Sequence, residues 1–154
     1  MKRRTLISFI IIISAAVALI GCSDSEVYKT TYTAKGESDN WFVTFHLTEN
    51  TKEENTSSEV IFTSKEEKVV QNFQYEVKAK PLQTEFYGDA GEIDFTTKED
   101  YETNAFKGTY TKDKSDSFYE GALNDVLVEI SWTENGEQLS EHLNLSYEKK
   151  LKQQ

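Results

Sequence analysis

The feature that most constrains the fold of this chain is a two-residue alternation of apolar and polar side chains. It is clearest in residues 73–80, where the apolar positions are Phe73, Tyr75, Val77 and Ala79. Successive side chains of a β-strand point to opposite faces, so this segment as a strand has one apolar and one polar face. After residue 22 no apolar stripe has helical spacing, beyond a possible single turn at residues 117–123. The pattern predicts an all-β protein.

A hairpin near the C-terminus is the best-defined local structure. Asn135-Gly136 is the preferred pair for a type I′ turn, because both central residues need φ > 0. The resulting pairs are Val126–Leu145, Val128–Leu143, Ile130–Glu141 and Trp132–Leu139 on one face, and Leu127–Asn144, Glu129–His142 and Ser131–Ser140 on the other. The first face is apolar except at Glu141, which predicts that it is buried. We expect Glu141 near a sheet edge, where its carboxylate reaches water.

Shorter segments with alternating, β-branched or aromatic residues predict the remaining strands. They are residues 28–34, 41–48, 60–62, 82–87, 92–97 and 106–110. Gly88-Asp89-Ala90-Gly91 is predicted to be the turn of a hairpin between two of these strands. Pro81 is predicted to end the strand before it or mark a sheet edge, because proline cannot donate to a ladder. Residues 98–104 and 112–117 are predicted to be polar loops.

About nine one-sided strands must pack their apolar faces together to bury them. A two-sheet antiparallel sandwich of immunoglobulin-like architecture is the expected fold, and a small β-barrel is the alternative. Eighteen aromatic residues follow residue 21. Their recurrence at the strand period favours a folded chain over a disordered one, despite the high charge. We expect residues 27–154 to form a single domain.

The first 22 residues have the layout of an export leader. Basic residues at positions 2–4 precede an apolar run at residues 6–20, and this order is typical of a secretory signal. The run is shorter than the roughly 20 residues of a membrane-spanning helix; an uncleaved anchor and a plain secretory signal are the alternatives. It ends in Leu19-Ile20-Gly21-Cys22, which contains the only cysteine and resembles the lipobox of bacterial lipoproteins.

That resemblance implies cleavage between Gly21 and Cys22 and a diacylglyceryl thioether, with palmitate-like acyl chains, on Cys22. The mature chain is then expected at the cell membrane, lipid-anchored on the extracytoplasmic face, with residues 22–26 as a tether. Because Cys22 is the sole cysteine, no intramolecular disulfide can stabilise the domain.

The charge of the chain narrows its partners. Without residues 1–21 the chain keeps all 27 acidic residues and 14 of the 17 basic ones, so its formal net charge is −13. Such a surface repels phosphate backbones, which argues against nucleic acid, and it disfavours lying flat on anionic lipid. Cationic proteins, peptides or metal ions are compatible partners on electrostatic grounds, but solubility of an exported domain is the favoured explanation of the charge.

Signatures of enzymes and metal proteins are missing after residue 22. The chain has no nucleophile elbow, P-loop or H-E-x-x-H motif, so no catalytic residue, cofactor or metal ligand is assigned. His46 and His142 fall on the polar faces of predicted strands, with Glu129 as the cross-strand partner of His142. The acid-rich residues 94–100 and 113–116 match no EF-hand spacing, and a calcium site there is left open.

Two tryptophan motifs lie near opposite ends of the chain that follows the leader. They are Gly36-Glu37-Ser38-Asp39-Asn40-Trp41 and Trp132-Thr133-Glu134-Asn135-Gly136. Together with the lipobox and Phe106-x-Gly108-x-Tyr110, they resemble small exported lipoproteins of Gram-positive bacteria. The resemblance implies the location and a β-sandwich, and it supplies no substrate and no catalytic residue. Trp41 and Trp132 are expected to be core or rim anchors beside turns.

The expected function is that of a membrane-anchored, surface-exposed binding or interaction module, and not that of an enzyme. A more specific alternative is an inhibitor or immunity protein that captures a cationic enzyme or toxin. Two further alternatives are a cell-wall hydrolase that uses two acidic residues and a carrier of a small ligand. The carrier requires a pocket between the two sheets.

Overall fold

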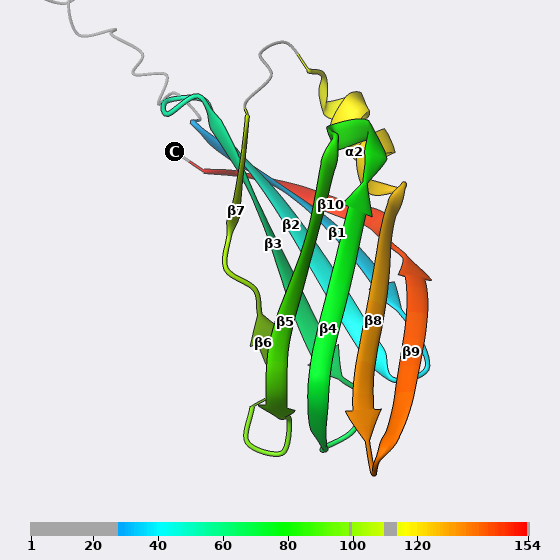
Figure 1. Cartoon of the computed structure of the whole chain (residues 1–154). Coiled ribbons are helices and arrows are strands. Elements are labelled where there is room, and N and C mark those ends of the chain that lie inside the picture. Colours follow the sequence, from blue (N-terminus) through cyan, green and yellow to red (C-terminus); the bar gives the residue numbers. More distant parts are fainter. Residues whose placement is uncertain (1–27, 99, 110–113, 154) are drawn as a thin grey trace, which may run out of the picture.

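The computed structural model describes residues 28–98, 100–109 and 114–153, and strands make up most of this part of the chain (Figure 1). The elements are β1 (Lys29–Glu37), β2 (Trp41–Asn50), β3 (Asn55–Ser64), β4 (Val69–Ala79), the 3-10 helix η1 (Lys80–Leu82), β5 (Thr84–Asp94), β6 (Asp100–Glu102), β7 (Phe106–Thr109), α2 (Asp116–Leu123), β8 (Val126–Glu134), β9 (Glu137–Asn144) and β10 (Ser146–Gln153).

The strands form two antiparallel sheets, and the four-stranded sheet lies across the six-stranded one in Figure 1. The six-stranded sheet has the order β10-β1-β2-β3-β6, and β7 also pairs with β3. The four-stranded sheet has the order β5-β4-β8-β9. The predicted all-β, two-sheet antiparallel sandwich is therefore confirmed, and the described strands do not close into a barrel.

The core lies between the two sheets and is built from the inward positions of alternating strands. In β4 these positions are Phe73, Tyr75, Val77 and Ala79, and in β2 they are Trp41, Val43, Phe45 and Leu47, all of them buried. The Trp41 ring contacts the rings of Phe73, Phe95 and Trp132 edge-on, with centroids 5.2–5.3 Å apart. Such contacts add about 0.5–1.5 kcal/mol each beyond area burial. Trp41 and Trp132 are thus core anchors.

The predicted register of the C-terminal hairpin is confirmed, although Leu139, expected on the buried face, is 36 % exposed. Strands β8 and β9 pair Val128 with Leu143 and Trp132 with Leu139, while Leu145 N–H donates to the Val126 carbonyl at 2.9 Å. The turn residues Asn135 and Gly136 have φ of 51° and 81°, as a type I′ turn requires. Glu141 lies on β9, the edge strand of its sheet, as expected. Its half-buried carboxylate, expected to reach water, instead accepts hydrogen bonds from Asn40.

The predicted hairpin at Gly88–Gly91 is wrong. Strand β5 runs straight through this segment and pairs along its length with β4, so Gly88 lies opposite Tyr75 inside the ladder. A side chain at Gly88 would collide with the Tyr75 ring, since a Cβ there would lie 2.3 Å from that ring. Gly91, with φ of 67°, lies beside a register shift in this ladder. The two glycines permit close packing and an irregularity, and they do not reverse the chain.

Three further elements differ from the prediction. Residues 98–104, expected to be loop, include the short strand β6, and β10 was not predicted at all. The helix α2 is longer than the expected single turn, and the Ser115 side chain caps it by accepting a hydrogen bond from the Phe118 N–H at 3.3 Å. Strand β10 is an edge strand whose lysines obscure its alternation, and such charges protect a sheet edge from aggregation. Tyr110, expected in the strand after residue 106, lies outside the described residues.

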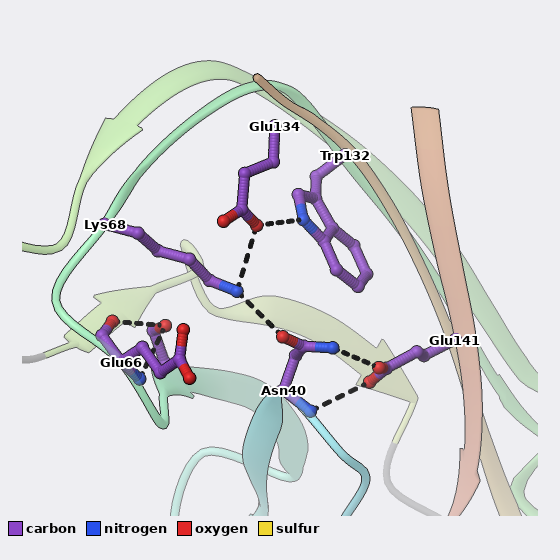
Figure 2. Close-up of polar contacts among 7 residues, drawn as sticks. Asn40, Glu66, Lys68, Trp132, Glu134 and Glu141 are labelled. Carbon is purple, nitrogen blue, oxygen red and sulfur yellow. Dashed lines mark hydrogen bonds and ion pairs between the residues drawn. The ribbon is translucent and has the colours of Figure 1, made fainter. Parts of the chain in front are cut away.

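A buried polar network closes the sandwich at the end where the β3–β4 loop crosses it (Figure 2). Lys68 in this loop is 8 % exposed, and its Nζ lies 5.4 Å from the ring centroids of both Trp41 and Trp132. The same Nζ lies 3.2 Å from Glu134 Oε2 and donates to Asn40 Oδ1 at 3.0 Å. The two tryptophan motifs found at opposite ends of the sequence therefore meet around one buried cation.

Carboxylates complete this network on both sides. Glu134 also accepts a hydrogen bond from Trp132 Nε1 at 3.2 Å, and this bond, followed by the contact with Lys68, holds the pKa of Glu134 below its usual value. Asn40 Nδ2 donates to Glu141 Oε1 at 2.6 Å. Burial works to raise the pKa of Glu141, but hydrogen bonds that include those from Asn40 outweigh it and lower that pKa. The ionised network thus ties the β1–β2 turn and the β3–β4 loop to the β8–β9 hairpin.

An aspartate on the buried face of the hairpin should destabilise the domain, whereas an aspartate on the exposed face should not. Leu143→Asp should unfold the domain, because burial of a large apolar side chain contributes about 1.5–3 kcal/mol and a carboxylate in the core adds a desolvation cost. Ser140→Asp on the same strand faces solvent, so the urea unfolding midpoint should change little. Equal damage from both substitutions would contradict the buried face assigned to β9.

The Lys68 network makes stability pH-dependent. Lys68→Met keeps an apolar side chain beside the indole rings but leaves Glu134 without its cation, so we expect a loss of about 2–3 kcal/mol near neutral pH. Because the folded-state pKa of Glu134 lies below 4.5, the contribution of this pair is present above that value and disappears as pH falls through the folded pKa.

Urea unfolding of both proteins at neutral pH and at about pH 3 checks this prediction, and the difference between them should shrink in acid. Lys65→Met in the same loop is the control, since its ion pair with Glu37 lies at the surface and should contribute at most about 1 kcal/mol. A difference for Lys68→Met that stayed constant with pH would argue against the network.

Candidate functional site

The outer face of the four-stranded sheet carries a hollow of about 800 Å³. Its walls come from all four strands of that sheet. One cross-strand row is Tyr87 of β5, Glu76 of β4, Glu129 of β8 and His142 of β9, and the adjacent row is Asp89, Gln74, Ser131 and Ser140. We call these eight residues the outer-face rows. Neighbouring positions on the same strands are buried in the core, so the strand alternation directs the outer-face rows to solvent.

Two like charges lie directly opposite each other at the centre of this face. Glu76 and Glu129 are register partners on β4 and β8, an arrangement that is destabilising without a counter-charge. Lys78 supplies it, with its Nζ 2.6 Å from Glu76 Oε2 and 3.6 Å from Glu129 Oε1. The hydrogen bond between Lys78 and Glu76 lowers the pKa of Glu76 and raises the pKa of Lys78. One cation therefore reaches both carboxylates.

Negative charge exceeds positive charge around the hollow. Glu85 lies opposite Lys78 in the ladder, and Asp89 lies at the end of the second row. The carboxylates of Glu76, Glu129 and Asp89 thus line the hollow, and Lys78 contacts the first two of them. His142 Nδ1 lies 3.6 Å from Glu129 Oε1, the same oxygen that Lys78 approaches. A carboxylate pair accepts several more hydrogen bonds than these contacts use.

An exposed aromatic ring flanks the carboxylates. Tyr87 is the register partner of Glu76, and 83 % of it is exposed, the most among the large apolar side chains of the described residues. An exposed tyrosine offers an apolar ring for stacking and a hydroxyl for hydrogen bonding. The arrangement suits a cationic side chain, which can contact the carboxylates with its charge and the ring with its stem.

The residues singled out from the sequence have different locations. The predicted pair of Glu129 and His142 is confirmed and lies within the outer-face rows. His46 also lies on a polar face, as expected, but on the six-stranded sheet, where Thr33 Oγ1 lies 3.0 Å from its Nδ1. Burial lowers the pKa of His46. Gly21 and Cys22 of the predicted lipobox lie outside the described residues.

Two acidic residues of the acid-rich segments, Asp94 and Asp116, are hydrogen-bonded within the fold. Asp94 accepts hydrogen bonds from Thr96 and Thr97, which lower the pKa of Asp94. Asp116 accepts hydrogen bonds from Lys150 and Tyr32. No cluster of three or more His, Cys, Asp or Glu side chains suited to a metal ion occurs in the described part of the chain.

Sequence reasoning missed the outer-face rows as a site. It had placed Gln74, Glu76, Glu129 and His142 on polar strand faces, but it did not pair β4 with β8, which brings Glu76 opposite Glu129. The sequence analysis also ended the predicted strand at Tyr87, whereas β5 continues to Asp94. A tyrosine in the middle of β5, at an outward position, is the residue that the pattern alone could have identified.

No protein-family model, curated protein or solved structure matches this chain. Across the residues that the structure describes, no helix is both long and apolar enough to cross a bilayer.

Proposed function

We propose that this protein is a lipid-anchored, extracytoplasmic binding module that captures a cationic protein segment on the outer face of its four-stranded sheet. The observation that carries the proposal is the cross-strand row Tyr87-Glu76-Glu129-His142 across a hollow of about 800 Å³. This row combines an aromatic ring, two adjacent carboxylates and an imidazole on a rigid scaffold.

The geometry favours an arginine or lysine side chain as the group that is bound. Side chains directly opposite in antiparallel strands have Cβ atoms about 4.5–5.5 Å apart, so the carboxylates of Glu76 and Glu129 can contact one cation together. Lys78 already does so from one side. A guanidinium has five N–H donors in a planar fork and also stacks on aromatic rings, and Tyr87 provides such a ring beside Glu76.

The charge of the whole domain supports the same kind of partner. A formal net charge of −13 after the leader attracts a basic protein over a distance of about one Debye length and raises its association rate. The outer-face rows then provide the local contacts. An inhibitor or immunity protein acting on a basic enzyme or toxin is the specific form of this function that we favour.

The predicted leader supplies the location. We infer that Leu19-Ile20-Gly21-Cys22 is processed as a lipobox, so that acyl chains on Cys22 hold the domain at the outer face of the cell membrane. Two lipid chains suffice for stable anchoring, whereas one does not. The tether of residues 22–26 keeps the binding face close to the membrane, where a secreted basic protein would pass.

Binding of nona-arginine, followed by isothermal titration calorimetry at low ionic strength, tests the binding face. The double variant Glu76→Gln/Glu129→Gln should weaken binding about five- to tenfold, because two exposed ion pairs with the peptide are lost and each contributes modestly. Tyr87→Ala should weaken it further. Affinity should also fall as salt is added.

The matched control is Glu59→Gln/Glu102→Gln, which removes the same charge from the six-stranded sheet. This control should change the affinity for nona-arginine less than about twofold. Both double variants remove the same net charge, so a larger loss in Glu76→Gln/Glu129→Gln measures the local contacts of the outer-face rows. Equal losses in the two would show that the peptide senses net charge alone, and the outer-face rows would not be the binding site.

The anchor has its own test in the native host. Cys22→Ala should abolish labelling by radioactive palmitate and leave unprocessed precursor or released protein, because the thiol is the acceptor of the diacylglyceryl group. Cys22→Ser is the isosteric companion. Labelling and membrane retention that persisted in Cys22→Ala would overturn the anchor.

A further inference from the structure

A second concavity is lined by residues of both sheets and of η1 and α2. The helix α2 lies at one end of the sandwich (Figure 1). Its volume is about 680 Å³, within the usual range of about 300–1,000 Å³ for small-molecule sites. Its walls come from β2, β3 and β7 of the six-stranded sheet, from β5 of the four-stranded sheet, and from both helices. It is separate from the outer-face rows, with which it shares no lining residue.

One part of the wall is aromatic and aliphatic. The rings of Phe86 and Phe106 stack with their centroids 4.0 Å apart and thereby join the edge strands of the two sheets. Leu47, Leu82 and Phe118 add further apolar surface. Such a surface suits the hydrocarbon or aromatic body of a ligand.

The inward positions of β3 and β5 change from apolar to hydroxyl-bearing residues where these two strands reach the cavity. Along β3 the inward positions Val60 and Phe62 are fully buried, and the corresponding positions nearer the cavity are Ser58 and Thr56. Along β5, Phe86 is likewise followed toward the cavity by Thr84. Hydroxyls at inward positions provide hydrogen-bonding groups, and an apolar core would have no use for them.

Basic residues outnumber acidic ones among the residues that line the cavity, although acidic residues predominate in the chain as a whole. Lys107 and Lys114 line the cavity together with one carboxylate, that of Glu85, whereas acidic residues outnumber basic ones 27 to 17 in the whole chain. Lys114 Nζ lies 4.3 Å from the centroid of the Phe118 ring, so its charge is held at the apolar wall. A cation beside an apolar surface is the arrangement that an amphipathic acid requires.

We propose that this cavity binds a small amphipathic carboxylate, with its apolar body against Phe86 and Phe106 and its carboxylate at Lys114 and Lys107. The site is independent of the cationic-segment face. In this proposal the same domain binds a cationic segment on the outer face of one sheet and an anionic small molecule between the two sheets.

Octanoate, 1-octanol and octylamine are probes of equal chain length that separate charge from apolar contact. Titration calorimetry of the folded domain should show one octanoate bound per chain, with 1-octanol weaker by about tenfold and octylamine weaker still. In methyl-detected NMR, octanoate should shift the signals of Leu47 and Leu82. Lys107→Gln/Lys114→Gln should reduce the preference for octanoate over 1-octanol to about twofold or less, because both residues are exposed and their replacement leaves the walls intact.

The control Lys98→Gln/Lys149→Gln removes the same charge from two exposed lysines outside the cavity and should keep the preference. Equal affinity for octanoate and 1-octanol in the unmodified domain would overturn the ligand class. Absence of binding by all three probes, or shifts confined to other methyl groups, would overturn the site itself. Neither result bears on nona-arginine binding, so failure of this inference is distinguishable from failure of the proposed function.

Discussion

The contact between Trp41 and Trp132 is the interaction on which the arrangement of the two sheets depends. One indole belongs to β2 and the other to β8, and their rings meet edge to face with centroids 5.3 Å apart. Lys68 lies over both rings, so the β3–β4 loop, which is one of the connections between the sheets, is fixed by the same pair. With a single cysteine in the chain, this packing and its polar network do the work that a disulfide does in many small exported domains.

What the sequence predicts well is what short segments determine by themselves. Alternation from Phe73 to Ala79 specifies which side chains point inward, and Asn135-Gly136 specifies the register of β8 and β9, because a one-residue slip would expose the apolar face. The pairing of β4 with β8 depends on strands far apart in sequence, and no local pattern specifies it. The outer-face rows are therefore not predictable as a site from the sequence, although the alternation assigns six of their eight members to polar strand faces. The exceptions are Asp89, which is predicted in a turn, and Tyr87, which is predicted at the end of a strand.

The errors have a common physical origin. Gly88 and Gly91 have the composition of a turn, yet Gly88 is required by the Tyr75 ring in the neighbouring strand and Gly91 by a bulge. In α2, the buried face consists only of Tyr119, Ala122 and Leu123, too short a stripe to give a helical period. Tertiary contacts determine the conformation of these segments. In α2, the Tyr119 hydroxyl donates a hydrogen bond to Glu49 at 2.6 Å, and Asp116 accepts one from Tyr32 at 2.9 Å.

The opposed carboxylates of Glu76 and Glu129 connect stability to the proposed binding. Their placement on adjacent strands works against folding, and a threonine or lysine at either position would pair better. Lys78 neutralises only part of this charge, and the hollow stays negative beside an exposed ring. A cation from a partner would relieve the remaining repulsion, so the free energy that the isolated sheet loses here would be recovered in the proposed complex. Because these side chains lie outside the core, this face can change its charge without disturbing the packed tryptophans beneath it.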